Sequence, residues 1–87
     1  MNYTILYRRG VERDMSKLPS VVLKRVDATI LGLGSNPRPH GSKKLSGHAN
    51  LYRVRVGDWR IVYEVSDVRR EIEIQIVANR KDVYRGL

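Results

Sequence analysis

Two alternating segments separated by only two residues dominate the second half of the chain. Leu51–Val56 and Trp59–Val65 each place an apolar or aromatic residue at every second position, which is the period of a β-strand with one buried face. The intervening loop is Gly57-Asp58, and a two-residue loop that begins with glycine favours a type II′ hairpin turn. The sequence therefore predicts a tight antiparallel hairpin.

This turn determines which residues face each other across the hairpin. Arg55 is expected opposite Arg60, and Tyr52 opposite Tyr63. One face of the hairpin is then apolar, whereas the other carries the arginines, including Arg53. Like charges directly opposite each other destabilise a sheet by about 0.2–1 kcal/mol. A polyanion lying on this face would remove the repulsion, so we expect the arginine face to bind one.

Length and cysteine content limit the possible classes of protein. The 87 residues (1–87) form one small domain, because the chain is too short for two cores. It has no cysteine, so neither a disulfide nor a thiolate nucleophile is available, and a reducing compartment is expected. No apolar run approaches the roughly 18 residues of a membrane span, and no signal-peptide core is present. A cytoplasmic protein without a membrane partner is expected.

The charge of the chain is strongly basic. Lysine and arginine total 17 against 9 acidic residues, a formal charge of +8, and 12 of the 17 are arginine. The planar guanidinium fork suits phosphate better than the point charge of lysine. Nucleic acid or a strongly acidic protein is the expected partner; the alternative is a basic surface that is simply solvated.

The first part of the chain predicts one strand and two helices. Residues 3–7 are typical of a short strand, and apolar residues at helical spacing indicate a short helix from Val11 to about Leu18. A second helix is expected to have Pro19 at its first position and to fray at its glycines. Its expected buried stripe consists of Val22, Val26, Ile30 and Leu33.

The remaining segments complete an α+β domain. Residues 35–50 are a polar connection, and a connection of this length is expected to be functional or to face a partner. Residues 71–78 alternate again, with Ile72, Ile74 and Ile76 expected on one face. The predicted element order is βααβββ: an antiparallel-rich twisted sheet with a helical hairpin packed on one face.

Pairing of the last two predicted strands brings another arginine to the same end of the sheet. With Ile61 opposite Ile76, the residues that follow arrive beside Arg60, so Arg80 is expected near Arg55. By strict alternation, however, Arg80 would lie on the apolar face, so the strand must bulge around residues 78–79. Three glutamates, Glu64, Glu71 and Glu73, are expected at the opposite end.

Three guanidiniums near the hydroxyl of Tyr84 suit a phosphodiester site. When RNA is cleaved by its own 2′-hydroxyl, the phosphorane gains negative charge that preorganised cations stabilise. The 2′-oxygen must lose a proton and the 5′-oxygen must gain one. Arginine is a poor base, whereas Tyr84, with a reference pKa near 10, would act as one if neighbouring arginines lower that value. The alternative role of Tyr84 is that of an ordinary anchoring ring.

Other polar and aromatic residues are weaker candidates. Lys43 and Lys44 are expected to contact phosphates, or else only to aid solubility. His40 and His48 are expected to be exposed and non-catalytic, and Trp59 belongs to the core face. Because no metal-ligand spacing, nucleotide-binding glycine pattern or Ser/His/Asp arrangement is present, neither a metal nor a cofactor is expected.

Three segments in combination resemble the RelE/ParE toxin superfamily: Lys44–Gly47 with the pattern K-L-x-G, Leu51–Val65 and Ile76–Arg85. The resemblance extends over essentially the whole chain and includes the predicted element order. It implies a toxin of a type II toxin–antitoxin system with a RelB-like antitoxin as partner. Members of the RelE branch cleave mRNA in the ribosomal A site, so the ribosome and mRNA are implied as further partners.

The resemblance also assigns roles to individual residues. Arg60 matches the arginine that stabilises the phosphate transition state, and Arg80 matches the one assigned to the leaving group. Tyr84 matches the tyrosine that orients or activates the 2′-hydroxyl. Arg53 and Arg55 match two substrate-gripping positions that are lysine in the best-known members, so a proton-transfer role for lysine does not carry over.

One further departure and two alternatives accompany this assignment. Asn79 replaces a common histidine, which removes one acid–base group, and Arg85 closes the series as an expected RNA contact. A ParE-like inhibitor of DNA gyrase, which hydrolyses nothing, shares the fold but usually lacks the C-terminal Arg/Tyr series. The third hypothesis is a catalytically silent protein that only binds RNA or antitoxin.

Overall fold

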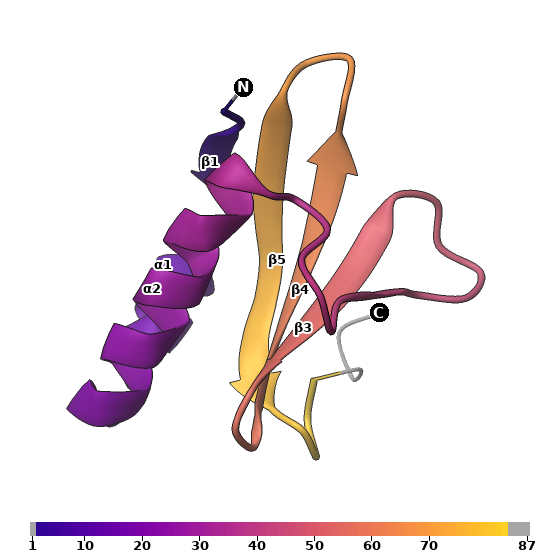
Figure 1. Cartoon of the computed structure of the whole chain (residues 1–87). Coiled ribbons are helices and arrows are strands. Elements are labelled where there is room, and N and C mark those ends of the chain that lie inside the picture. The colour runs from indigo at the N-terminus through magenta and orange to yellow at the C-terminus, as the bar shows by residue number, and fades with distance from the viewer. Residues whose placement is uncertain (1, 84–87) are drawn as a thin grey trace.

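The computed structural model describes residues 2–83, which form a five-stranded sheet and two helices. The sheet order is β1-β5-β4-β3-β2; β1 runs parallel to β5 and the other pairs are antiparallel. Both helices pack on one side of the sheet (Figure 1), which confirms the predicted α+β class. The elements are β1 (Thr4–Tyr7), α1 (Val11–Met15), α2 (Ser20–Ser35), β2 (Lys43–Lys44), β3 (Leu51–Val56), β4 (Trp59–Ser66) and β5 (Glu71–Asn79).

The hairpin of β3 and β4 has the predicted register. Arg55 lies opposite Arg60, and Tyr52 lies opposite Tyr63. Gly57 has a φ of 60°, whereas Asp58 is not among the residues with positive φ. A positive φ at the first loop position alone is the pattern of a type II′ turn.

Strand β5 contains a β-bulge, but at a different position from the predicted one. Val62 pairs with Ile76, whereas the next residue, Tyr63, pairs with Ile74. Gln75 is therefore the extra residue on β5, and every position after it changes faces.

The bulge corrects three predictions about β5. Ile61 pairs with Val77 instead of Ile76. Val77 is buried in the core, while Ile76 is half-buried on the other face. The bulge also lies before residues 78–79, where it was predicted. It still moves the end of the strand off the apolar face, because Ala78 pairs with an arginine of β4.

Helix α2 begins and ends differently from the prediction. Pro19 is its N-cap rather than its first helical residue, and the helix continues through both Gly32 and Gly34 to Ser35. The amide of Tyr3 donates a 2.7 Å hydrogen bond to the carbonyl oxygen of Gly34. A Cβ atom on Gly34 would lie 3.3 Å from the Tyr3 oxygen, so the absence of a side chain lets α2 approach β1 closely.

The main core lies between the helices and one face of the sheet. Within residues 2–83, none of the helices is long and apolar enough to cross a membrane. The core residues from the helices are Val11, Met15, Val26, Ile30 and Leu33, and those from the strands are Val54, Val56, Ile61, Tyr63, Val65, Ile72, Ile74 and Val77.

The face of the sheet opposite the helices is here called the distal face. It carries Arg53, Arg55 and Arg60, and pairing places Val62 and Ala78 beside them. A turn after β5 follows on this side of the molecule (Figure 1); the amide of Val83 donates to the carbonyl oxygen of Asn79 at 3.0 Å. Val62 and Val83 are both buried but lie outside the main core, so part of the distal face is covered.

Candidate nucleic-acid interface

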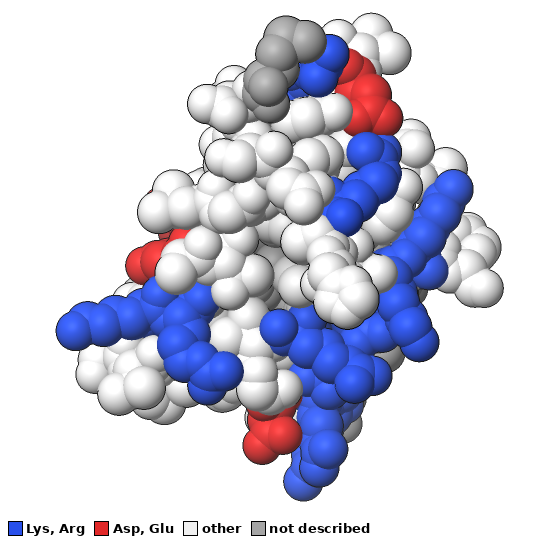
Figure 2. Space-filling view, viewed as in Figure 1, with Lys and Arg blue, Asp and Glu red and all other residues white. Residues whose placement is uncertain are grey.

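Three arginines meet where the hairpin turn and the end of β5 come together. Arg55 lies opposite Arg60, and Arg60 pairs on its other side with Ala78. The amide of Arg80 donates a 2.8 Å hydrogen bond to the carbonyl oxygen of Asp58 in the turn. We call Arg55, Arg60 and Arg80 the arginine cluster. Figure 2 shows lysine and arginine atoms gathered over this lower end of the sheet.

The three members of the arginine cluster differ in how firmly they are held. The Nη1 atom of the Arg60 guanidinium donates to the carbonyl oxygens of both Gly57 and Trp59, each at 2.9 Å. Arg60 is half-buried, whereas Arg55 and Arg80 are exposed. A fixed guanidinium between two accessible ones can receive a phosphate without a large rearrangement.

The prediction that Arg53 lies on an exposed surface is wrong. Arg53 is only 7% exposed as a residue, and its Nε has no hydrogen-bond partner in the described part of the chain. Its neighbours across the sheet are Lys43 and the buried Val62. Burying the Nε donor of a charged group without a partner is unfavourable.

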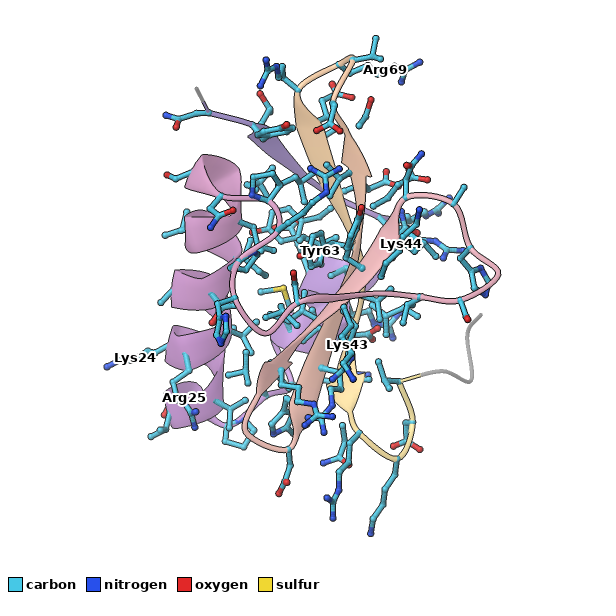
Figure 3. All side chains as sticks on the ribbon, turned by 45° about the vertical axis from the view of Figure 1, so that its right-hand side comes forward. Lys24, Arg25, Lys43, Lys44, Tyr63 and Arg69 are labelled. Atoms are coloured by element: carbon cyan, nitrogen blue, oxygen red, sulfur yellow. The ribbon has the colours of Figure 1, made fainter. Side chains whose placement is uncertain are left out.

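Lys43 and Lys44 do not act as a pair. They form the two-residue strand β2, which the sequence did not predict, at the edge of the sheet (Figure 3). Lys43 pairs with Arg53 and so shares the distal face, whereas Lys44 pairs with Tyr52 of the helix-facing side. Both are exposed, but only Lys43 lies on the face of the arginine cluster.

The C-terminal candidates are only partly described. Tyr84 and Arg85 lie outside the described residues. Asn79 forms the turn that leads to them: its side-chain oxygen accepts from the amide of Lys81 at 3.1 Å, and its carbonyl oxygen accepts from the amide of Asp82 at 2.9 Å. These two contacts form a hydrogen-bonded turn directly after β5.

The polar connection is fastened to the sheet by contacts that spacing did not reveal. Arg38 forms a 3.0 Å salt bridge with Asp67 and donates through Nε to the hydroxyl of Tyr52, also at 3.0 Å. Tyr3 donates to the same carboxylate. The hydrogen bond from Arg38 holds the pKa of Asp67 below its ordinary value, and Tyr3 adds to this effect. These partners are far apart in sequence, so no local pattern could have identified them.

A buried tyrosine fastens the same connection from the core. The hydroxyl of Tyr63 donates a 2.8 Å hydrogen bond to the carbonyl oxygen of Pro37. Burial is the main cause of the raised pKa of Tyr63. Its ring also stacks on that of Tyr52, with 5.9 Å between the centroids. The first part of the connection is therefore part of the folded domain.

The predictions about the three glutamates and the two histidines agree with the structure. Glu64, Glu71 and Glu73 line one pocket at the end of the sheet away from the arginine cluster. His40 and His48 are exposed. Among residues 2–83, no group of three His, Cys, Asp or Glu side chains is placed to hold a metal ion.

Comparison with known proteins identifies the family. Residues 5–84 match the sequence model described as the ParE toxin of the type II toxin–antitoxin system parDE. A protein named RelE1 from Methanocaldococcus jannaschii is 32% identical, covering 99% of both chains. Toxin RelG of Mycobacterium tuberculosis is 30% identical, covering 98% of this chain and 99% of its own.

Solved structures agree with this assignment. The archaeal RelE–RelB complex from Pyrococcus horikoshii matches with a TM-score of 0.82 and 28% identity, over 92% of this chain and 97% of that one. The RelBE2 toxin–antitoxin complex of Mycobacterium tuberculosis matches with a TM-score of 0.80 and 27% identity, over 92% and 100%. This chain therefore belongs to the RelE/ParE superfamily of toxins from type II toxin–antitoxin systems.

Proposed function

We propose that this toxin is a ribosome-dependent endoribonuclease that cleaves mRNA in the A site and so inhibits translation. The observation that carries the proposal is the meeting of Arg55, Arg60 and Arg80 at one end of the distal face. Two opposed arginines with an exposed third repel one another, and a phosphodiester would relieve that repulsion. No metal or cofactor is required for this reaction.

Each member of the arginine cluster has a proposed role in the reaction. The 2′-oxygen attacks the adjacent phosphorus, the bond from phosphorus to the 5′-oxygen breaks, and a 2′,3′-cyclic phosphate results. Arg60, held over the turn by its two carbonyl contacts, stabilises the charge of the phosphorane. Arg80 stabilises the departing 5′-oxygen, and Arg55 binds a non-bridging oxygen. Tyr84 orients or activates the 2′-hydroxyl.

The absence of a strong base among these groups supports dependence on the ribosome. Positioning of a nucleophile can contribute up to about 7–11 kcal/mol in ideal cases, and the ribosome would supply that positioning. We therefore expect strong cleavage of translated message and little cleavage of free RNA. Equal rates on the two substrates would contradict the proposal.

Translation-coupled primer extension tests the assignment of roles. Arg60→Ala is expected to lower cleavage by about 10²–10³-fold, the loss that other enzymes show when one preorganised hydrogen-bond donor to the transition state is removed. Arg69→Ala, which removes an exposed arginine at the other end of the sheet, is the matched control and should cleave normally. Full activity of Tyr84→Phe would exclude a chemical role for that hydroxyl.

A second function is inhibition of DNA gyrase without hydrolysis. The match to the sequence model of ParE toxins favours it, whereas the presence of Arg60, Arg80 and Tyr84 together favours the nuclease. A supercoiling assay separates the two. Inhibition of gyrase by the protein, with no cleavage of translated message, would establish the second function and overturn the first.

A cognate RelB-like antitoxin is the proposed protein partner. The structural relatives from Pyrococcus horikoshii and Mycobacterium tuberculosis were solved as complexes with such antitoxins. An acidic or amphipathic antitoxin segment would cover the arginine cluster or displace the chain that follows β5. Crosslinks confined to the outer surface of α2 would argue against direct masking.

A further inference from the structure

A second group of basic residues lines a groove at the β1 edge of the sheet. The groove lies where β1 and α1 meet the middle of β5, and Asp14 is the one acidic residue among those that line it. We call this the basic groove; its defining residues are Arg8, Arg9, Arg13, Lys17, Gln75 and Ile76.

The positive charge of the basic groove is not neutralised within the described part of the protein. Across residues 2–83, neither Asp14 nor any other carboxylate lies within salt-bridge distance of the groove's four cations. Arg8 instead donates to the side-chain oxygen of Gln75 at 3.4 Å. Four cations around one groove repel one another at low ionic strength, and an anionic ligand would remove that repulsion.

The β-bulge joins the basic groove to the distal face. Gln75 is the extra residue of the bulge, and bulges commonly redirect a side chain next to a functional site. The following residue, Ile76, lies on the distal face and is half-buried. A strand rises about 3.3 Å per residue, so Ile76 is only about 7 Å along β5 from Ala78, and Ala78 pairs with Arg60.

We propose that the basic groove binds backbone phosphates of RNA beside the segment held by the arginine cluster. The inference rests on the proposed function, because it takes the polyanion on the distal face to be RNA. Three of the four cations are arginines, whose planar forks match phosphate oxygens. The Gln75 amide already donates to Glu73 and accepts from Arg8, which leaves one N–H and one lone pair for a base or ribose. Ile76 offers an apolar contact to a base. An acidic protein segment would use the charges but not this combination.

Binding measurements with a cleavage-deficient protein test the proposal. In an Arg60→Ala background, the double variant Arg9→Ala/Arg13→Ala removes two exposed groove cations. The matched control is Lys24→Ala/Arg69→Ala, which removes the same charge from two exposed positions, on α2 and in the turn before β5 (Figure 3). Circular dichroism melting should show both proteins equally folded.

The ligand is a single-stranded RNA made non-cleavable by 2′-O-methylation, titrated over a range of KCl concentrations. Loss of two phosphate contacts should reduce the slope of log affinity against log salt by about 1.4, measured relative to the control pair. Cosedimentation with ribosomal small subunits lacking mRNA forms the second arm. If the groove variant binds the single-stranded RNA more weakly than the control pair, the substrate strand is the source of the phosphates. If only its cosedimentation with small subunits is weaker, the source is ribosomal RNA.

Two results would overturn the proposal. The groove variant could match the control pair in both arms, or it could lose affinity for a polyglutamate peptide more than for either RNA. Failure of the nuclease proposal is recognised separately, because these measurements need no cleavage. Wild-type protein that binds RNA through the groove but never cuts translated message would disprove only the proposed reaction.

Discussion

The amide of Arg80 and the carbonyl oxygen of Asp58 are joined by a 2.8 Å hydrogen bond. This bond ties the residue after β5 to the turn between β3 and β4, although the two residues are on separate strand connections. Since only backbone atoms take part, the chain keeps its path whatever side chain occupies position 80. The contribution of the Arg80 guanidinium to activity can therefore be separated from its position in the fold.

Arg80→Ala should lower cleavage of translated message by about 10²–10³-fold, because a charge-stabilising donor is lost while the backbone bond remains. Primer extension measures the effect. Lys81→Ala is the matched control: Lys81 is the adjacent exposed cation, and its hydrogen bond to Asn79 is also made through its backbone amide. Equal activity of the two variants would remove Arg80 from the proposed mechanism.

Arg53→Met should increase the free energy of unfolding by about 1–3 kcal/mol, because it removes a buried donor that lacks a partner and keeps an unbranched side chain. Urea denaturation measures this change, and Arg69→Met at an exposed position should remain within about 0.5 kcal/mol of wild type. Retention of an unfavourable buried arginine would then indicate a functional requirement. A destabilised Arg53→Met protein would show that the guanidinium is satisfied in solution.

Gly57→Ala should destabilise the protein by about 1–2 kcal/mol, the penalty for an L-residue in the left-handed region. Gly57 has a φ of 60°, and the nearest atom to an added Cβ would be Arg25 Nη1 at 3.5 Å, an ordinary contact. Strain, not a clash, is therefore the expected cause. Gly57→Asn should lose less stability by chemical denaturation, since asparagine tolerates this conformation; an equal loss would implicate the side-chain contact.

The stability of the protein should fall as the pH rises above about 10. Burial raises the pKa of Tyr63 above its ordinary value of 10.0, so the folded state retains a proton that the unfolded state has lost. The stabilisation from this group is thus complete below pH 10.0 and disappears as the pH passes the folded-state pKa. The pKa of Tyr7 is also raised, chiefly by burial and then by the negative charges of Asp27 and Glu12.

Tyr63→Phe separates the two roles of this hydroxyl. At neutral pH it should cost about 1 kcal/mol, because the hydrogen bond to Pro37 is lost. Its stability should nevertheless decline less steeply with alkaline pH than that of wild type. Urea unfolding at a series of pH values measures both effects, and parallel pH profiles would show that another group controls alkaline unfolding.

Local sequence was sufficient where one short loop controlled the geometry. The two residues between β3 and β4 fix which side chains oppose each other, so the Arg55–Arg60 pair followed from alternation alone. Helical spacing likewise indicated the buried residues Val26, Ile30 and Leu33. Resemblance of three segments to known toxins indicated the family, and comparison over residues 5–84 confirms it.

Register beyond the hairpin depended on packing between distant elements. Nothing in residues 71–79 marks Gln75 as the extra residue, because a bulge is selected by what fits against β4 and the helices. The same limit applies to Arg53. Alternation placed it on the correct face of the sheet, but its burial depends on packing with other parts of the fold. It also applies to the Arg38–Asp67 contact, which joins residues 29 positions apart.

The sequence by itself determined the hairpin, its opposed arginines, the basic character and the toxin family, because these depend on short-range spacing and side-chain chemistry. Only the tertiary structure decided that Arg53 is buried, that Lys43 and Lys44 face opposite ways, and that Ala78 reaches Arg60. The physical reason for the last of these is that one inserted residue in β5 reverses every later side chain. Whether such an insertion is stable depends on contacts between strands and helices that are far apart in the chain.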